Sequence, residues 1–255
     1  RKTLGNRHRD TLTSIGDLGL LLQDKGNLAT AAPLLHEALK VSRKTLGNRH
    51  SDTLISIHNL GALLHDKGDL AAAEPLFREA LEVQRETLGD RHPSTLASIG
   101  NLGLLLRAKG DPAAAEPLCR EVLEVARETL GNRHPGTLAS INNLGKLLMV
   151  KGDLAAAEPL LREALEGTRE TLGDRHPDTL ASINNLGGLL QDKGNLAAAE
   201  PLYREALEMS RETLGDRHPD TLIFMNNLGS LLEDKGDLAA AEPLFREAEG
   251  AGGDA

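Results

Sequence analysis

Apolar residues recur along this chain with the spacing of a helix, in a pattern that repeats every 42 residues. In one copy Leu96, Ile99, Leu102 and Leu106 lie three or four residues apart, which places them on one side of an α-helix. A second apolar stripe follows over residues 112–130. Each copy therefore predicts two helices.

Start and stop signals flank both stripes. Pro93 precedes the first helix, and Lys109-Gly110 ends it. Asp111 is placed to cap the start of the second helix, and Gly131 follows its last residue. The short connection predicts that the two helices run antiparallel as a hairpin.

A proline about six residues beyond the cap interrupts the second helix of every copy. It removes one backbone hydrogen bond, so we expect a kink, and a break in the helix is the alternative. The apolar pattern continues in register on both sides. The six prolines are Pro33, Pro75, Pro117, Pro159, Pro201 and Pro243.

The repeat decides the architecture. We divide the chain into copies spanning residues 1–42, 43–84, 85–126, 127–168, 169–210 and 211–252, followed by a short glycine-rich tail. A lone hairpin cannot bury its apolar face, so neighbouring copies must stack. We expect an all-α fold, an α-solenoid of antiparallel helix hairpins, with residues 1–255 forming a single solenoid domain.

One spacing carries a family resemblance. It runs Ile99-x2-Leu102-Gly103-x2-Leu106, then Gly110 and Ala115-x3-Cys119. This resembles the tetratricopeptide pattern W-x2-L-G-x2-Y…A-x3-F. Gly103 and Ala115 are small where the two helices of a hairpin must approach closely.

The copies also depart from that pattern. Ile99 and Leu106 replace the aromatic residues, Arg127 replaces the closing proline, and each copy is longer than 34 residues. The added length, residues 127–135, is similar to the kinesin light chain and nephrocystin-type repeats. The resemblance implies a right-handed superhelix that binds a protein or peptide.

Composition excludes several other classes of protein. The net charge of −9 disfavours nucleic acid, and no apolar run is long enough to cross a membrane. One cysteine favours a reducing compartment, so we expect a cytoplasmic protein. The chain begins with Arg1 in place of methionine, so we expect it to be part of a longer protein.

We find no residue set for catalysis, a metal or a cofactor, and expect no enzyme. His58 and His65 are two helical turns apart, too far to share one ion, and we expect them to be ordinary surface residues. Cys119 stands where other copies have Leu, Phe or Tyr, so we expect a buried thiol. One histidine recurs in the loop between copies, and we expect it to bond the backbone there: His8, His50, His92, His134, His176 and His218.

Positions that differ between copies indicate a binding surface on the first helix. In the family, the first helices line the concave groove, which implies that these side chains contact a peptide. An asparagine row runs beside them, and an amide can both donate to and accept from a peptide backbone. The alternative is that these amides bond one another between copies. The predicted contacts are His58, Asn59, His65, Asn101, Arg107, Asn143, Lys146, Met149, Asn185, Gln191, Asn227 and Glu233.

Three functions are compatible with this pattern. The first is a scaffold that holds a peptide or partner segment in the groove. The second is head-to-tail self-assembly, because near-identical copies make one end resemble the surface on which the other would pack. The third is the sensor array of a larger signalling protein.

Overall fold

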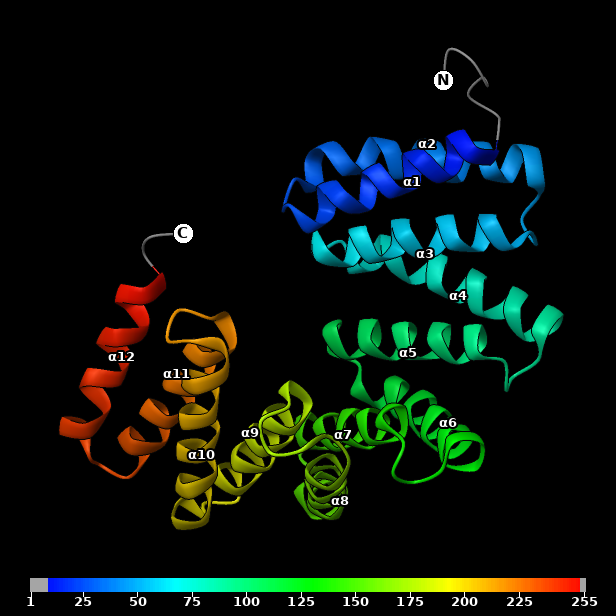
Figure 1. The fold of residues 1–255 in the computed structure, drawn as a ribbon. Helices are drawn as coiled ribbons and strands as arrows, with labels where there is room; N and C mark the ends of the chain where they lie inside the picture. The colour runs from blue at the N-terminus through cyan, green and yellow to red at the C-terminus, as the bar shows by residue number, and fades with distance from the viewer. Residues whose placement is uncertain (1–8, 253–255) are drawn as a thin grey trace. The chain divides into compact units, whose positions relative to one another are not determined.

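The computed structural model describes residues 9–252, and within them it contains helices and no strands. The all-α, α-solenoid class predicted above is confirmed (Figure 1). The helices, which alternate between first and second helix of a copy, are α1 Arg9–Asp24, α2 Leu28–Leu46, α3 Ser51–Asp66, α4 Leu70–Leu88, α5 Pro93–Ala108, α6 Pro112–Leu130, α7 Pro135–Val150, α8 Leu154–Leu172, α9 Pro177–Asp192, α10 Leu196–Leu214, α11 Pro219–Asp234 and α12 Leu238–Gly252.

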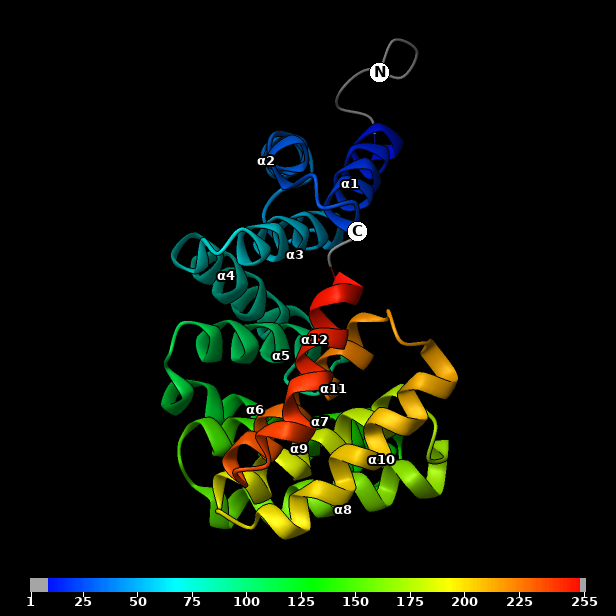
Figure 2. The ribbon, with the colours of Figure 1, turned by 90° about the vertical axis from the view of Figure 1, so that its left-hand side faces the viewer.

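The chain forms two compact units, whose boundary lies between Leu118 and Cys119, inside α6. In unit 1, α2 packs on both α1 and α3, and α4 packs on both α3 and α5. In unit 2, each helix from α8 to α11 packs on the helix before it and the helix after it. Figure 2 gives a second view of these hairpins. This serial packing is how each copy buries the apolar face that a lone hairpin would expose.

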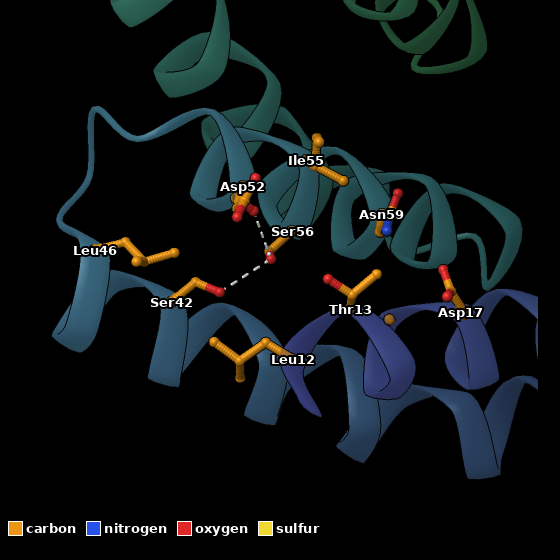
Figure 3. A pocket seen from close by; sticks show the side chains of 10 residues that line it. Leu12, Thr13, Asp17, Ser42, Leu46, Asp52, Ile55, Ser56 and Asn59 are labelled. Atoms are coloured by element: carbon orange, nitrogen blue, oxygen red, sulfur yellow. Dashed lines mark hydrogen bonds between the residues drawn. The ribbon is translucent and has the colours of Figure 1, made fainter. Parts of the chain in front are cut away.

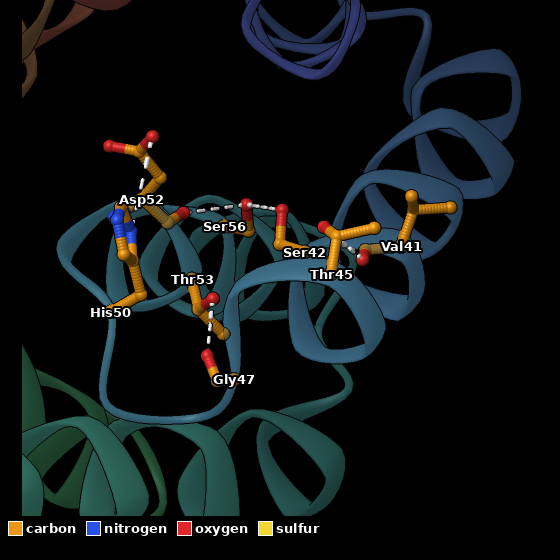
Figure 4. Close-up of polar contacts among 8 residues, drawn as sticks. All are labelled: Val41, Ser42, Thr45, Gly47, His50, Asp52, Thr53 and Ser56. Carbon is orange, nitrogen blue, oxygen red and sulfur yellow. Dashed lines mark hydrogen bonds and ion pairs between the residues drawn. The ribbon is translucent and has the colours of Figure 1, made fainter. Parts of the chain in front are cut away.

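The recurring histidine begins the first helix. His50 precedes α3, and its Nδ1 accepts the Asp52 backbone N–H at 3.1 Å (Figure 4). The same bond to the residue two positions on forms at His92, His134, His176 and His218. The expectation that these imidazoles bond the backbone is confirmed for these five. They are N-caps, which satisfy a backbone donor at the start of the helix. His8 lies outside the described residues.

A buried threonine ties three of the first helices, α3, α5 and α9, to the end of the preceding second helix. The Thr53 hydroxyl donates to the Gly47 carbonyl at 2.7 Å, and Thr95 and Thr179 repeat this bond to Gly89 and Gly173 at 2.8 Å. Gly47 has a φ of 87°, which a side chain would strain. In these three copies the turn is therefore bonded to the first helix that follows it.

Removing one histidine cap is expected to destabilise unit 2 modestly. His134→Ala loses the acceptor for the Gly136 N–H and should cost about 1 kcal/mol of unfolding free energy. His134→Asn keeps a side-chain oxygen at the cap, so its unfolding free energy should lie within a few tenths of a kcal/mol of the wild-type value. Urea unfolding followed by circular dichroism measures both. Equal losses for alanine and asparagine would show that the imidazole does not act as a cap.

The second helices begin and end where predicted. Asp111 accepts the Ala114 N–H at 3.0 Å, and Asp69, Asp153, Asn195 and Asp237 make the equivalent bond. Each helix continues without interruption through its proline, so the alternative of a break is wrong.

Close approach within the hairpin explains the invariant glycine of each first helix. A Cβ at Gly187 would lie 2.9 Å from the ring of Tyr203, and one at Gly61 would lie 2.7 Å from the ring of Phe77. Ala115 is fully buried, as this role requires. Cys119 is only half-buried, so the expectation of a buried thiol is wrong, although Leu35, Phe77, Leu161 and Tyr203 at the equivalent position are buried.

The Glu–Arg pairs of the second helices extend across copies. Arg78 pairs with Glu74 in the same helix at 2.7 Å, and Lys109 of the next copy bonds the same carboxylate. Lys193 and Lys235 bond Glu158 and Glu200 in the same way. The lysine hydrogen bond is the largest cause of a lowered pKa at all three glutamates. These repeated charges join neighbouring copies.

Candidate functional site

A hollow with both polar and apolar lining residues lies between the first helices of the first two copies. It measures about 100 Å³, and residues from α1, α2 and α3 line it (Figure 3). Ser42 and Ser56 face each other there at 3.3 Å, and Ser56 also donates to the Asp52 carbonyl. Asn59, a predicted contact residue, lies on its wall beside Asp17.

Unit 2 builds the same hollow twice from equivalent positions. One, of about 160 Å³, lies among α7, α8 and α9. The other, of about 430 Å³, is lined by α7, α9, the end of α10 and α11. We call the larger one the unit 2 hollow. Its lining is Asn142, Asn143, Lys146, Pro177, Leu180, Ala181, Asn184, Asn185, Leu214, Asp220, Ile223 and Phe224.

The unit 2 hollow combines amides with an apolar wall. Asn185 donates to the Asn142 side-chain oxygen at 3.0 Å, which fixes the amide orientations between α7 and α9. Asn143 is exposed beside them, and Ile223 is 49% exposed. Lys146 and Asp220 supply one charge of each sign. Such a lining suits a ligand with both backbone-like polar groups and an apolar side chain.

The structure thus brings together three predicted contact residues, Asn143, Lys146 and Asn185. It also shows that amides bond one another between copies, since Asn227 donates to Asn184 at 2.7 Å. The two interpretations of the asparagine row are compatible, because Asn184 and Asn185 both bond across copies and line the hollow.

Gln191 is engaged within the protein. Its amide donates to Asp234 at 2.6 Å and accepts the Tyr203 hydroxyl at 3.1 Å. Burial raises the pKa of Tyr203 to about 12, with further contributions from the carboxylates of Asp192 and Asp234. The Gln191 amide therefore joins two copies, and it does not line the unit 2 hollow.

His58 also differs from expectation. It is half-buried, and its Nε2 lies 2.8 Å from the Ser98 hydroxyl of the next copy. Ser98 donates to Gln84, so His58 donates at Nε2 and its Nδ1 is left buried with no partner. Burial lowers the pKa of His58. The expectation of an ordinary surface residue is wrong here, because the next copy covers the ring.

The other predicted contacts lie outside these three hollows. His65 is on the surface, with Nδ1 3.3 Å from Asp66. Met149 is half-buried near Gly188, and Glu233 is exposed on α11. Asn101 and Arg107 are half-buried on α5.

Sequence reasoning missed the apolar half of the unit 2 hollow. Phe224 stands where the five other copies have serine, at Ser14, Ser56, Ser98, Ser140 and Ser182. At the position of Ile223 the three preceding copies have alanine, at Ala97, Ala139 and Ala181, and the second copy has Ile55. These departures from the repeat were the available signal. Asn142 and Asn184 were also absent from the predicted set.

Within residues 9–252, no three His, Cys, Asp or Glu side chains gather as a metal site requires. No helix in that range is both long and apolar enough to span a bilayer.

Comparison with known proteins agrees with the repeat. A family model described as Tetratricopeptide repeat matches residues 10–86, 55–118, 95–166, 138–210 and 180–251. No curated protein matches the chain. The crystal structure of a putative kinesin light chain from Podosopora anserina, with nearly identical TPR-like repeats, is 29% identical with a TM-score of 0.71, over 81% of this chain and 98% of that chain.

Two further structures share the fold. BtubC (BKLC) from P. vanneervenii is 22% identical with a TM-score of 0.68, over 89% of this chain and 90% of that one. PilW, a type IV pilus biogenesis factor, is 16% identical with a TM-score of 0.67, over 95% of this chain and 94% of that chain. The predicted resemblance to kinesin light chain-like repeats is confirmed. With matches covering nearly all described residues, the chain belongs to the tetratricopeptide repeat family.

Proposed function

We propose that this protein is an interaction scaffold that binds an extended peptide segment of a partner protein in the unit 2 hollow. The observation that supports it is the joining of oriented amides and exposed apolar surface in one hollow of about 430 Å³. Either feature alone would suit many ligands. Together they favour a peptide, because a peptide presents backbone amides to the asparagines and side chains to the apolar surface.

The amides supply the polar half of the recognition. Asn143 is exposed on the first helix, and Asn142 and Asn185 are held by their mutual hydrogen bond. An amide fixed before binding loses less conformational entropy when it bonds a ligand. The exposed Ile223 would receive an apolar side chain of the peptide.

The experiment is selection of peptides from a displayed random library on the immobilised chain, followed by affinity measurement. The test variant carries Asn143→Ala, Lys146→Ala and Asn185→Ala. The loss of three polar contacts of about 1 kcal/mol each should lower the affinity for the selected peptide about a hundredfold.

The matched control carries Arg162→Ala, Glu166→Ala and Arg204→Ala, three exposed residues of the second helices. It should bind the peptide like wild type, and both variants should keep the wild-type circular dichroism spectrum. A peptide that binds both variants equally well would place its site elsewhere on the protein.

We also propose that the protein acts by binding and not by catalysis, in the cytoplasm. The charged pairs that join copies support the first part, since Glu74, Glu158 and Glu200 are each held by two cations. The single cysteine supports a reducing compartment.

A further inference from the structure

The first helix of the chain exposes an apolar face that later copies bury. Leu18 and Leu21 of α1 are 47% and 50% exposed. The leucines at the equivalent positions of the later copies are at most 3% exposed: Leu60, Leu63, Leu102, Leu105, Leu144, Leu147, Leu186, Leu189, Leu228 and Leu231.

The cover in those copies is a second helix. Within the units, α2 packs on α3, α4 on α5, α8 on α9, and α10 on α11. By analogy, the exposed face of α1 fits the second helix of a preceding copy.

The last second helix, α12, exposes the matching face. Leu238 is 63% exposed, whereas Leu28, Leu70, Leu154 and Leu196 are half-buried at the equivalent position. The Glu242 side chain is 59% exposed, whereas those of Glu74, Glu158 and Glu200 are 19%, 23% and 21% exposed. In the inner copies these groups lie against the following copy.

Charge complements shape at the two faces. Glu74, Glu158 and Glu200 each bond a lysine of the following copy, at Lys109, Lys193 and Lys235. Glu242 is paired with Arg246 in its own helix. The lysine that the pattern would bring to Glu242 stands at the end of α1, where Lys25 is exposed.

We propose that a second copy of this chain docks head to tail, with α11 and α12 of one copy covering α1 of the other. The contact reproduces the junction already present between copies inside the chain. Leu18 and Leu21 become buried, and Lys25 bonds Glu242 of the neighbouring molecule. Such a contact uses two different surfaces, so the pair of molecules keeps one free surface of each kind for further association.

The polar positions of the junction fit with one exception. Asn226 is exposed, and its amide would donate to the carboxylate of Asp17. The equivalent bond within the chain runs in the opposite direction, from Asn227 to Asn184. The exception is Glu233, which would meet Asp24. Two inner junctions place glutamine there, in the Gln23–Asp66 and Gln191–Asp234 bonds, both at 2.6 Å. The like charges of Glu233 and Asp24 weaken the association.

The experiment is sedimentation velocity of the 255-residue chain from low micromolar to submillimolar concentration. The average mass should rise with concentration. Leu18→Glu with Leu21→Glu should weaken association at least a hundredfold, roughly the effect of leaving two leucines unburied. Ile55→Glu with Leu104→Glu is the control, since both residues are exposed on first helices of the same unit. The control should associate like wild type.

Mixing distinguishes head-to-tail docking from a symmetric dimer. A tail variant carries Leu238→Glu and Glu242→Lys. The α1 variant and the tail variant should each be monomeric alone and should form a one-to-one complex when mixed. A tail variant that still dimerises, or a wild type of constant monomer mass, overturns the proposal.

Glu233→Gln tests the register of the contact. It creates the glutamine–aspartate pair that two inner junctions contain and should strengthen association about fivefold, the value of one hydrogen bond. Unchanged association would overturn this register. These readouts are masses of the chain alone, so they succeed or fail independently of peptide binding.

Discussion

Replacing Ile141 by alanine should cost about 2–5 kcal/mol of unfolding free energy, because the side chain leaves a cavity that its surroundings fill only partly. Ile141 is fully buried in α7, among Leu138, Leu144 and Leu148, which are at most 1% exposed. It holds the position that in tetratricopeptide repeats is occupied by an aromatic residue. We expect the loss to appear as a lower urea midpoint for unit 2.

The control is Ile223→Ala, the same change at a residue of α11 that is 49% exposed. It should cost less than about 1 kcal/mol, because less apolar surface leaves the interior. Ile223→Ala should also lower the affinity for a peptide selected on the unit 2 hollow. The Ile141→Ala variant should bind that peptide with unchanged affinity at temperatures where the variant stays folded. Equal losses of stability from the two substitutions would contradict the burial of Ile141.

Two adjacent glycines of α9 should respond to alanine with opposite signs. A Cβ at Gly187 would lie 2.9 Å from the ring of Tyr203, which is 3% exposed and has no room to move aside. Overpacking of this kind costs about 1–3 kcal/mol and exceeds the gain in helix propensity. Gly187→Ala should therefore destabilise the protein.

At Gly188 the nearest atoms to an added Cβ are the Tyr203 hydroxyl at 3.5 Å and the Met149 methyl at 3.6 Å, which are ordinary contacts. Gly188→Ala should stabilise by about 0.5–1 kcal/mol, because alanine restricts the unfolded chain and favours the helix. Thermal unfolding of the two variants measures the sign of each effect. Stabilisation by both would mean that the hairpin is less tightly packed than the structure shows.

Part of the candidate site could be predicted by comparing copies within the chain. Asn143, Lys146 and Asn185 were identified from positions that vary, or carry amides, on the first helix, and they meet in the unit 2 hollow. Phe224 was not identified, because a single large residue among serines gives no indication of which way it faces. Its contribution depends on how α11 packs against α9.

Gln191 and His58 show the opposite error. Both occupy positions that vary between copies, which predicted contact with a ligand. In the structure Gln191 bonds Asp234, and His58 bonds Ser98, each in the following copy. Variation along a helix marks every surface that the common core does not constrain, and junctions between copies belong to that class as much as grooves do.

Helix limits and caps follow from the amino-acid sequence alone, because they depend on interactions within a few residues. The order of packing follows from the repeat, because each hairpin needs the next copy to bury its apolar face. The second helix at Pro112–Leu130, its Asp111 cap and the turn glycines at positive φ were all predictable. Which polar residues face a hollow and which face the next copy was decided only by tertiary packing. The physical reason is that a side chain's neighbours across a junction depend on the angle between hairpins, which sums many small contacts and leaves no local signature in the chain.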